Sequence, residues 1–178
     1  MSVIEVDQIY YNSIEGLGGG SSIFPCLKLR TIVYNDISDM GNTWAVRDVF
    51  NTNPLINTGG FSVTANNITV DAAGRYFVYS NMIHRDQTQA ATAQDNYRNT
   101  MWHRWTIDGT AQIEESRSSY NRDYANHDRS STSLTAVYNL DAGSVLRLEF
   151  RNYTGYNSPN WLELLDNSHV LIYKISEA

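Results

Sequence analysis

The chain has 178 residues, of which 42% are hydrophobic, 12% aromatic and 18% charged, so its length and composition exclude a disordered chain and predict one globular domain. Its formal net charge of −6 disfavours non-specific binding to nucleic acid. The first residues lack the basic and apolar regions of a signal peptide, and no apolar run is long enough to span a bilayer, so we expect synthesis in the cytoplasm and no membrane partner.

Residues 1–22 are predicted to form an N-terminal arm that ends in a flexible Gly/Ser linker at residues 16–22. The arm is apolar but too short to fold alone, and its candidate docking side chains are Ile4, Val6, Ile9, Tyr10 and Tyr11. It either pairs as an edge strand with its own domain or a neighbouring protomer, or docks on a larger partner. Residues 23–178 are predicted to form the folded domain.

A first strand is predicted over residues 26–34. Cys26 is the only cysteine, which excludes a disulfide framework and a cysteine-based zinc site, and we expect it to be a half-buried residue at the start of that strand. Residues 35–57 show no sustained periodicity and are predicted to be irregular. Their expected anchors in the core are Trp44, Val46, Val49 and Phe50.

The clearest strand signal lies between residues 61 and 83. Residues 61–70 are predicted to form one strand and residues 75–83 a second, joined by a tight turn at residues 71–74 into a hairpin. In the second strand both faces are apolar, because the period of two places Phe77, Tyr79 and Ile83 opposite the set Tyr76, Val78, Ser80 and Met82. Such a strand needs cover on both sides, so we expect either a second sheet region or another copy of the chain over the face that does not enter the core.

The remaining chain alternates between polar segments and further strands. Residues 85–99 are predicted to be a long surface loop, and residues 100–107 and 110–113 to form a hairpin around Asp108-Gly109. Residues 114–131 are again expected to be polar loop. A second hairpin is predicted from residues 133–140 and 144–150, and a last strand over residues 167–175. This series of short strands predicts an all-β sandwich.

Two of these segments resemble one family. The spacing of Gly74, Tyr76, Phe77 and Tyr79 resembles the central strand of the C1q/TNF-like jelly roll, and residues 133–150 are similar to its pattern of an apolar strand ending in Leu, a Gly-containing turn and a Val/Leu strand. The turn departs from the family, which often has Gly-Asp where this chain has Asp-Ala-Gly. The resemblance implies an antiparallel jelly-roll β-sandwich and assembly into compact homotrimers. Candidates for the core or the trimer interface are Tyr76, Tyr79, Tyr138, Phe150 and Tyr173.

No catalytic, cofactor or metal site is predicted, because the sequence has no nucleophile elbow, phosphate-binding Gly loop or HExxH motif. Glu114 and Glu115 are adjacent, so on a strand they would point to opposite faces and could not act as an acid/base pair. His84 and His103 could approach each other across strands but lack a third metal ligand. The oxygen-rich set Asp123, Asn126 and Asp128 lacks EF-hand spacing and reads as a polar surface loop, although some C1q-like trimers bind calcium near their axis.

One loop is a candidate binding surface. Residues 152–161 combine aromatic and amide side chains, a composition typical of surfaces that recognise partners, and the candidates are Tyr153, Tyr156, Asn157 and Trp161. Such a loop would suit a protein partner or a glycan. The alternative is a structural turn whose Trp161 packs back onto the sandwich.

These observations lead to a functional hypothesis. A non-secreted jelly roll without catalytic groups, carrying an apolar arm on a Gly linker, looks like a virion structural protein. We expect a homotrimeric phage capsid decoration or cement protein, anchored through its arm to the major capsid protein or other virion proteins. The alternative is a glycan- or receptor-binding tip of a phage head or tail fibre that uses residues 152–161.

Overall fold

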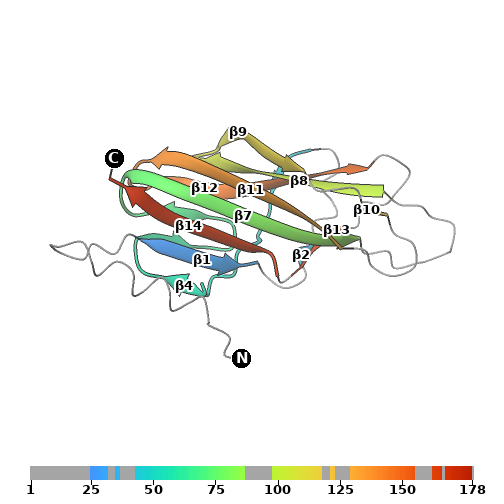
Figure 1. Cartoon of the computed structure of the whole chain (residues 1–178), viewed down its shortest axis with the longest axis horizontal. Helices are drawn as coiled ribbons and strands as arrows, with labels where there is room; N and C mark the ends of the chain where they lie inside the picture. Colours follow the sequence, from blue (N-terminus) through green and yellow to red (C-terminus); the bar gives the residue numbers. More distant parts are fainter. Residues whose placement is uncertain are drawn as a thin grey trace, which may run out of the picture.

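The computed structural model describes residues 25–31, 35–36, 43–86, 98–117, 121–122, 129–154, 162–165 and 167–177. These residues form two antiparallel sheets that pack face to face (Figure 1). The described residues include no helix, and hence none of the length and apolarity needed to cross a membrane. The all-β sandwich predicted from the sequence is confirmed.

Sheet I, the first of these, is centred on the long strand β7 (Gly74–Asp86). Its order is β2 (Asn35–Asp36), β13 (Leu162–Leu164), β7, β14 (His169–Ser176), β1 (Cys26–Arg30) and β4 (Ile56–Asn57). Strand β11 (Arg129–Leu140) pairs with the other edge of β7 along its whole length. The predicted last strand of the domain therefore lies beside the predicted central strand, and the predicted first strand lies beside the last.

Sheet II is centred on β8 (Arg98–Ile107) and β12 (Val145–Thr154). Its order is β10 (Asn121–Arg122), β8, β12, β6 (Ile68–Val70) and β5 (Phe61–Val63). The short strand β3 (Ala45–Val46) pairs with β12, and β9 (Thr110–Arg117) pairs with β8. Strands β9 and β11 are thus edge strands of opposite sheets.

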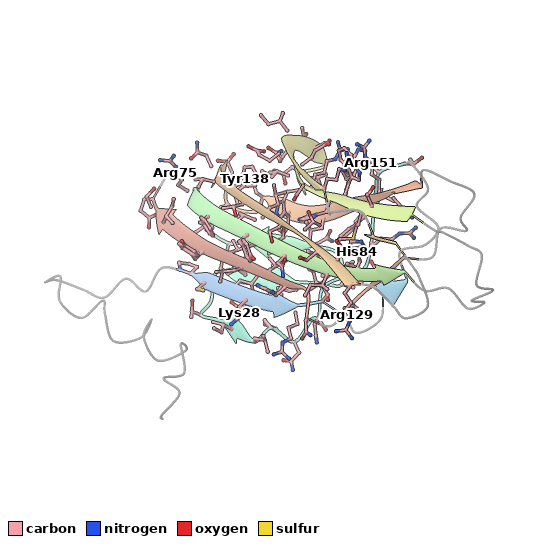
Figure 2. All side chains as sticks on the ribbon, turned by 45° about the vertical axis from the view of Figure 1, so that its right-hand side comes forward. Lys28, Arg75, His84, Arg129, Tyr138 and Arg151 are labelled. Carbon is pink, nitrogen blue, oxygen red and sulfur yellow. The ribbon has the colours of Figure 1, made fainter. Side chains whose placement is uncertain are left out.

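The core fills the space between the sheets, because each long strand alternates inward and outward side chains. Strand β11 alternates strictly between exposed and buried residues, from Arg129 to the buried Leu140. Side chains from both sheets occupy this space (Figure 2). The largest fully buried ones are Trp105, Tyr76, Phe50 and Phe150. Each such side chain contributes roughly 1.5–3 kcal/mol by leaving water.

The predicted hairpins at residues 61–83 and 133–150 are wrong. β6 belongs to sheet II and β7 to sheet I, and likewise β11 belongs to sheet I and β12 to sheet II. The two turns between these strands cross from one sheet to the other and bond to each other, since the amide of Val70 donates to the Ser144 carbonyl (3.1 Å) and that of Gly143 to the Val70 carbonyl (2.8 Å). Residues 61–70, predicted to be one strand, instead form the β5–β6 hairpin.

The Asp108-Gly109 hairpin is confirmed. Both turn residues have positive φ, 50° for Asp108 and 79° for Gly109, as a tight two-residue hairpin loop requires. The Asp108 carboxylate also accepts a hydrogen bond from the amide of Val145 (2.8 Å) and so ties the turn to β12.

Two predicted irregular segments contain more structure than expected. Residues 114–131 were predicted to be polar loop, but β9 continues to Arg117 and β11 begins at Arg129. The polar side chains there bridge the two edge strands, since Ser116 Oγ donates to the Ser133 carbonyl (2.6 Å). Within residues 35–57 the short strands β2, β3 and β4 form. The expected anchors Val49 and Phe50 are fully buried, whereas Trp44 and Val46 are only half-buried and do not belong to the core.

Candidate functional site

The outer face of sheet I carries a continuous apolar and aromatic surface. The strand registers place side chains in rows across β11, β7, β14 and β1. The first row is Val137, Phe77, Tyr173 and Cys26, and the second is Thr135, Tyr79, Leu171 and Lys28. We call these eight residues the outer-face rows. The neighbouring row is polar and consists of Ser133, Asn81, His169 and Arg30.

The aromatic side chains of the outer-face rows pack against their neighbours on the sheet. The rings of Phe77 and Tyr173 stack with centroids 4.9 Å apart, and the ring of Tyr79 lies 5.5 Å from that of His169. These side chains still stay partly exposed, and Val137 at the edge keeps 44% of its surface open. A pre-arranged aromatic surface of this kind is typical of a protein–protein contact.

The structure divides the five predicted aromatic candidates into two groups. Tyr79 and Tyr173 belong to the outer-face rows, whereas Tyr76, Phe150 and Tyr138 are buried between the sheets. The Tyr76 hydroxyl donates to the Ala72 carbonyl (2.8 Å), and burial raises the pKa of this phenol. Burial and the nearby Glu114 carboxylate, to which Tyr138 donates (3.3 Å), likewise raise the pKa of Tyr138.

Sequence reasoning missed part of this surface. The alternation of β7 placed Phe77 on the same side as Tyr79, yet neither Phe77 nor Leu171 was a candidate. Leu171 is two residues before Tyr173 and thus shares its face by the period of two. The position of Val137 beside Phe77 needed the pairing of β11 with β7, which no local pattern shows.

Arginine and tryptophan side chains form a second cluster, on the outer face of sheet II. The guanidinium of Arg151 lies 4.7 Å from the ring centroid of Trp44 and 4.2 Å from that of Trp102, and Arg104 lies 4.2 Å from that of Trp44. Arg104 Nε also donates to Glu149 (2.8 Å). Because Arg104 and Arg151 already pair with carboxylates and stack on these rings, the cluster braces β3, β8 and β12.

The side chains of Glu114 and Glu115 point to opposite faces of their strand, as predicted. Glu114 accepts the hydrogen bond from Tyr138, whereas Glu115 pairs with Arg104 (3.5 Å) and Arg151 (3.8 Å) on the outer face. The two carboxylates therefore lie on opposite faces of β9 and serve structural contacts.

His84 and His103 both lie in the core, from opposite sheets. Burial lowers the pKa of His84 to about 4, and burial together with the proximity of His84 lowers that of His103 to about 3. Within the described part of the chain, no three His, Cys, Asp or Glu residues are placed to hold a metal ion. Cys26 is half-buried as expected, and burial raises the pKa of its thiol.

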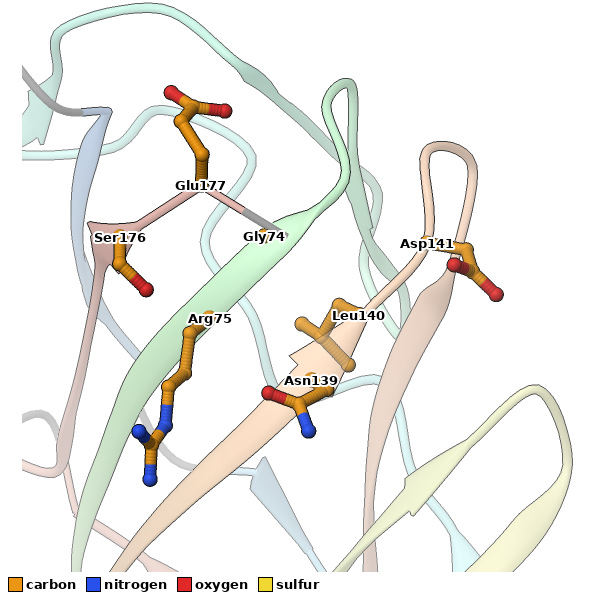
Figure 3. Close-up of a pocket in the computed structure, with 7 residues that line it drawn as sticks. All are labelled: Gly74, Arg75, Asn139, Leu140, Asp141, Ser176 and Glu177. Atoms are coloured by element: carbon orange, nitrogen blue, oxygen red, sulfur yellow. The ribbon is translucent and has the colours of Figure 1, made fainter.

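One pocket of about 520 Å³ opens at the end of the sandwich where the C-terminal strand finishes. Figure 3 shows its lining, which comes from the start of β7, the end of β11 with the next residue, and the end of β14 with the next residue: Gly74, Arg75, Asn139, Leu140, Asp141, Ser176 and Glu177. Glu177 forms an ion pair with the buried Lys174 (2.5 Å). None of these lining residues forms a nucleophile–base pair in the hydrogen bonds found among the described residues.

Several predicted sites lie outside the described residues. They are the arm candidates Ile4, Val6, Ile9, Tyr10 and Tyr11, the oxygen-rich set Asp123, Asn126 and Asp128, and the loop candidates Tyr156, Asn157 and Trp161. The backbone of Tyr153 belongs to β12, but its side chain is not described. The arm, its boundary with the domain and the binding loop therefore remain predictions.

Comparison with known proteins identifies the fold. No protein-family model and no curated protein matches the sequence. Murine APRIL at pH 8.0 is similar in structure over 85% of this chain and 99% of its own, with a TM-score of 0.54 and 17% identity. Eiger TNF from S. frugiperda is similar over 87% of this chain and 94% of its own, with a TM-score of 0.53 and 14% identity. The chain therefore has the TNF-like jelly-roll fold.

Proposed function

We propose that the chain is a non-enzymatic structural protein that forms a homotrimer through the outer-face rows of sheet I. The observation that carries this proposal is the partly exposed surface of Phe77, Tyr79, Leu171 and Tyr173 on the central strands of that sheet. Aromatic and aliphatic side chains left partly in water gain roughly 25 cal/mol for each Å² that a neighbouring copy covers. The resemblance to C1q/TNF-like proteins, which assemble as compact trimers, supports closed three-fold symmetry.

Within this proposal the trimer is a capsid decoration or cement protein of a phage. Its support is the combination of an apolar arm on a Gly linker with a domain in which the adjacent carboxylates of Glu114 and Glu115 serve structural contacts. The arm grips a neighbouring capsid subunit, and the jelly roll supplies three arms at once. Three linked contacts bind much more tightly than one, provided that the linkers reach their sites. In this proposal the protein acts as part of the virion.

A truncated chain that begins at Ser21 tests the role of the arm. The full chain and the truncated chain are each mixed with purified capsids of the virus that encodes them, and co-sedimentation is measured. We expect both to be trimers and only the full chain to sediment with capsids. Equal binding by the truncated chain would refute the role of the arm.

Substitution of Leu171 by arginine tests the interface itself. Leu171 lies in the middle of the outer-face rows, so a buried unpaired charge there should dissociate the trimer. The matched control is Ile113→Arg, because Ile113 is 93% exposed on β9 of the other sheet. We expect the control to keep the parent mass. A trimeric Leu171→Arg variant would place the interface elsewhere, and a monomeric parent chain would favour the glycan- or receptor-binding alternative at residues 152–161.

A further inference from the structure

The core of the sandwich is polar at one end. From Ser80 onward the inward side chains of β7 are partly hydrophilic, and the facing strands carry others. The buried polar residues here are Ser80, His84, Thr100, His103, Ser130, Thr132 and Asn152. The opposite end, around Tyr76, Leu140 and Leu146, also buries Ser144 and Lys174, but these two have partners in Asp108 and Glu177. Burying polar groups is unfavourable unless each one finds a hydrogen-bond partner.

Asn152 and His103, which belong to this polar end, have atoms without such a partner among the described residues. Asn152 is fully buried, and neither its Nδ2 nor its Oδ1 bonds to any described residue. His103 is also fully buried, and its Nε2 lies 2.9 Å from Ser80 Oγ, but its Nδ1 has no partner among the described residues. Asn152 therefore leaves one donor and one acceptor, and His103 one ring nitrogen, without a hydrogen bond to any described residue.

The strand register places these two residues near each other. His103 pairs with Phe150 across β8 and β12, and Asn152 is the next inward residue of β12. The two residues are thus diagonal neighbours on the same face, with backbones about 7–8 Å apart. At that separation, one intervening molecule that makes a hydrogen bond of about 2.8 Å to each side chain can bridge them.

We propose that an internal water molecule binds between Asn152 and His103 and bridges the two strands inside the core. Water suits this set because it both donates and accepts: it accepts from Asn152 Nδ2, or donates to Asn152 Oδ1, and bonds His103 Nδ1 in either tautomer. Buried waters usually occupy such sites and make about three hydrogen bonds to otherwise unsatisfied groups.

A metal ion fits the same residues less well. No carboxylate or thiolate lies among the buried polar residues of this end, and the described residues hold no group of three metal-binding side chains. Zinc sites in proteins use three or four such ligands. The site accordingly takes a neutral ligand with both donor and acceptor character.

Nuclear magnetic resonance of the full chain tests the proposal. Cross-relaxation with water is measured at the side-chain amide protons of Asn152 and at the ring protons of His103. The comparison variants are Asn152→Leu, which removes the polar partner at similar size, and Met101→Leu, which alters the residue paired with Asn152 without changing its polarity. We expect long-lived water contacts at both residues in the parent and in Met101→Leu, and loss of the His103 contact in Asn152→Leu.

Three results would overturn the proposal. The first is an Asn152 amide without any water contact, or one that contacts protons of another residue of the chain instead. The second is a clear rise in Tm in Asn152→Leu, because relief of a dry unsatisfied amide predicts that gain. The third is a rise in Tm on adding Zn²⁺ that His103→Phe abolishes, which would mark a metal site. The measurement on the parent chain decides the question even if Asn152→Leu does not fold.

Discussion

Substitution of His103 by glutamine should lower the stability of the chain at neutral pH and raise it at acidic pH. The pKa of His103 is about 3 in the folded chain because of burial and the nearby His84, against an ordinary value of 6.5. Between these two values the unfolded chain binds one more proton at this residue than the folded chain does. The contribution of neutral His103 to the free energy of unfolding is therefore fully present above about pH 6.5 and is lost as the pH falls toward 3.

The magnitude follows from the size of the shift. Each pH unit below 6.5 lowers the free energy of unfolding by about 1.4 kcal/mol for one proton. At pH 4, His103 alone has therefore lowered it by about 3 kcal/mol. Glutamine does not titrate, but it loses the ring that stacks on Phe150 at 6.3 Å. We expect that loss to cost about 1–2 kcal/mol at pH 7. The variant should thus be less stable than the parent at pH 7 and more stable below about pH 5.

The assay is urea unfolding at fixed protein concentration, with the free energy of unfolding measured from pH 7 to pH 4. His169→Gln is the control, because His169 lies on the outer face beside Tyr79 and not in the core. This variant should keep the fall in the free energy of unfolding that His103 causes at acidic pH, because it leaves the core unchanged. A constant difference between His103→Gln and the parent over the whole pH range would refute the reasoning.

Three further predictions concern single contacts. Tyr138→Phe removes the hydrogen bond to Glu114 that joins β11 to β9 and should cost about 1 kcal/mol in urea unfolding; no loss would mean that the contact contributes nothing. Trp105→Ala, which removes a fully buried ring stacked on Phe50, should cost about 3–5 kcal/mol, and a loss below about 1 kcal/mol would contradict its place in the core. Gly109→Ala should cost about 1 kcal/mol because φ is 79° there, and an unchanged Tm would show that the turn adopts another conformation.

Much of the fold can be predicted from the sequence because strand alternation is a local property. The two faces of β7, the turn at Asp108-Gly109 and the final strand all follow from period, turn chemistry and β-branched or aromatic residues. The C1q/TNF-like resemblance then supplied the architecture that these strands share.

The pairing of the strands could not be predicted in the same way. The turns after Val70 and after Leu140 have the residues of hairpin turns, yet each carries the chain from one sheet to the other. A local turn signal does not distinguish a hairpin from such a crossing, because the difference lies in hydrogen bonds between two turns far apart in the sequence, such as that from Gly143 to Val70. The outer-face rows were therefore only partly predictable.

The polar end of the core could not be predicted from the sequence either. His84 and His103 could be suspected of lying close together, but Asn152 was read as part of a binding loop. Its burial follows from the length of β12, which continues to Thr154. Strand ends are difficult to place where polar residues occupy inward positions, since the usual apolar alternation is lost there.

The mass of the full chain in solution tests the central claim most directly. Light scattering is measured over a dilution series from high micromolar to high nanomolar concentration. A trimer held by the outer-face rows predicts a mass of about 61 kDa, three times the 20.2 kDa of one chain, that persists on dilution. A mass of 20.2 kDa at every concentration would contradict the account, because the aromatic surface of sheet I would then be stable in water without a second copy.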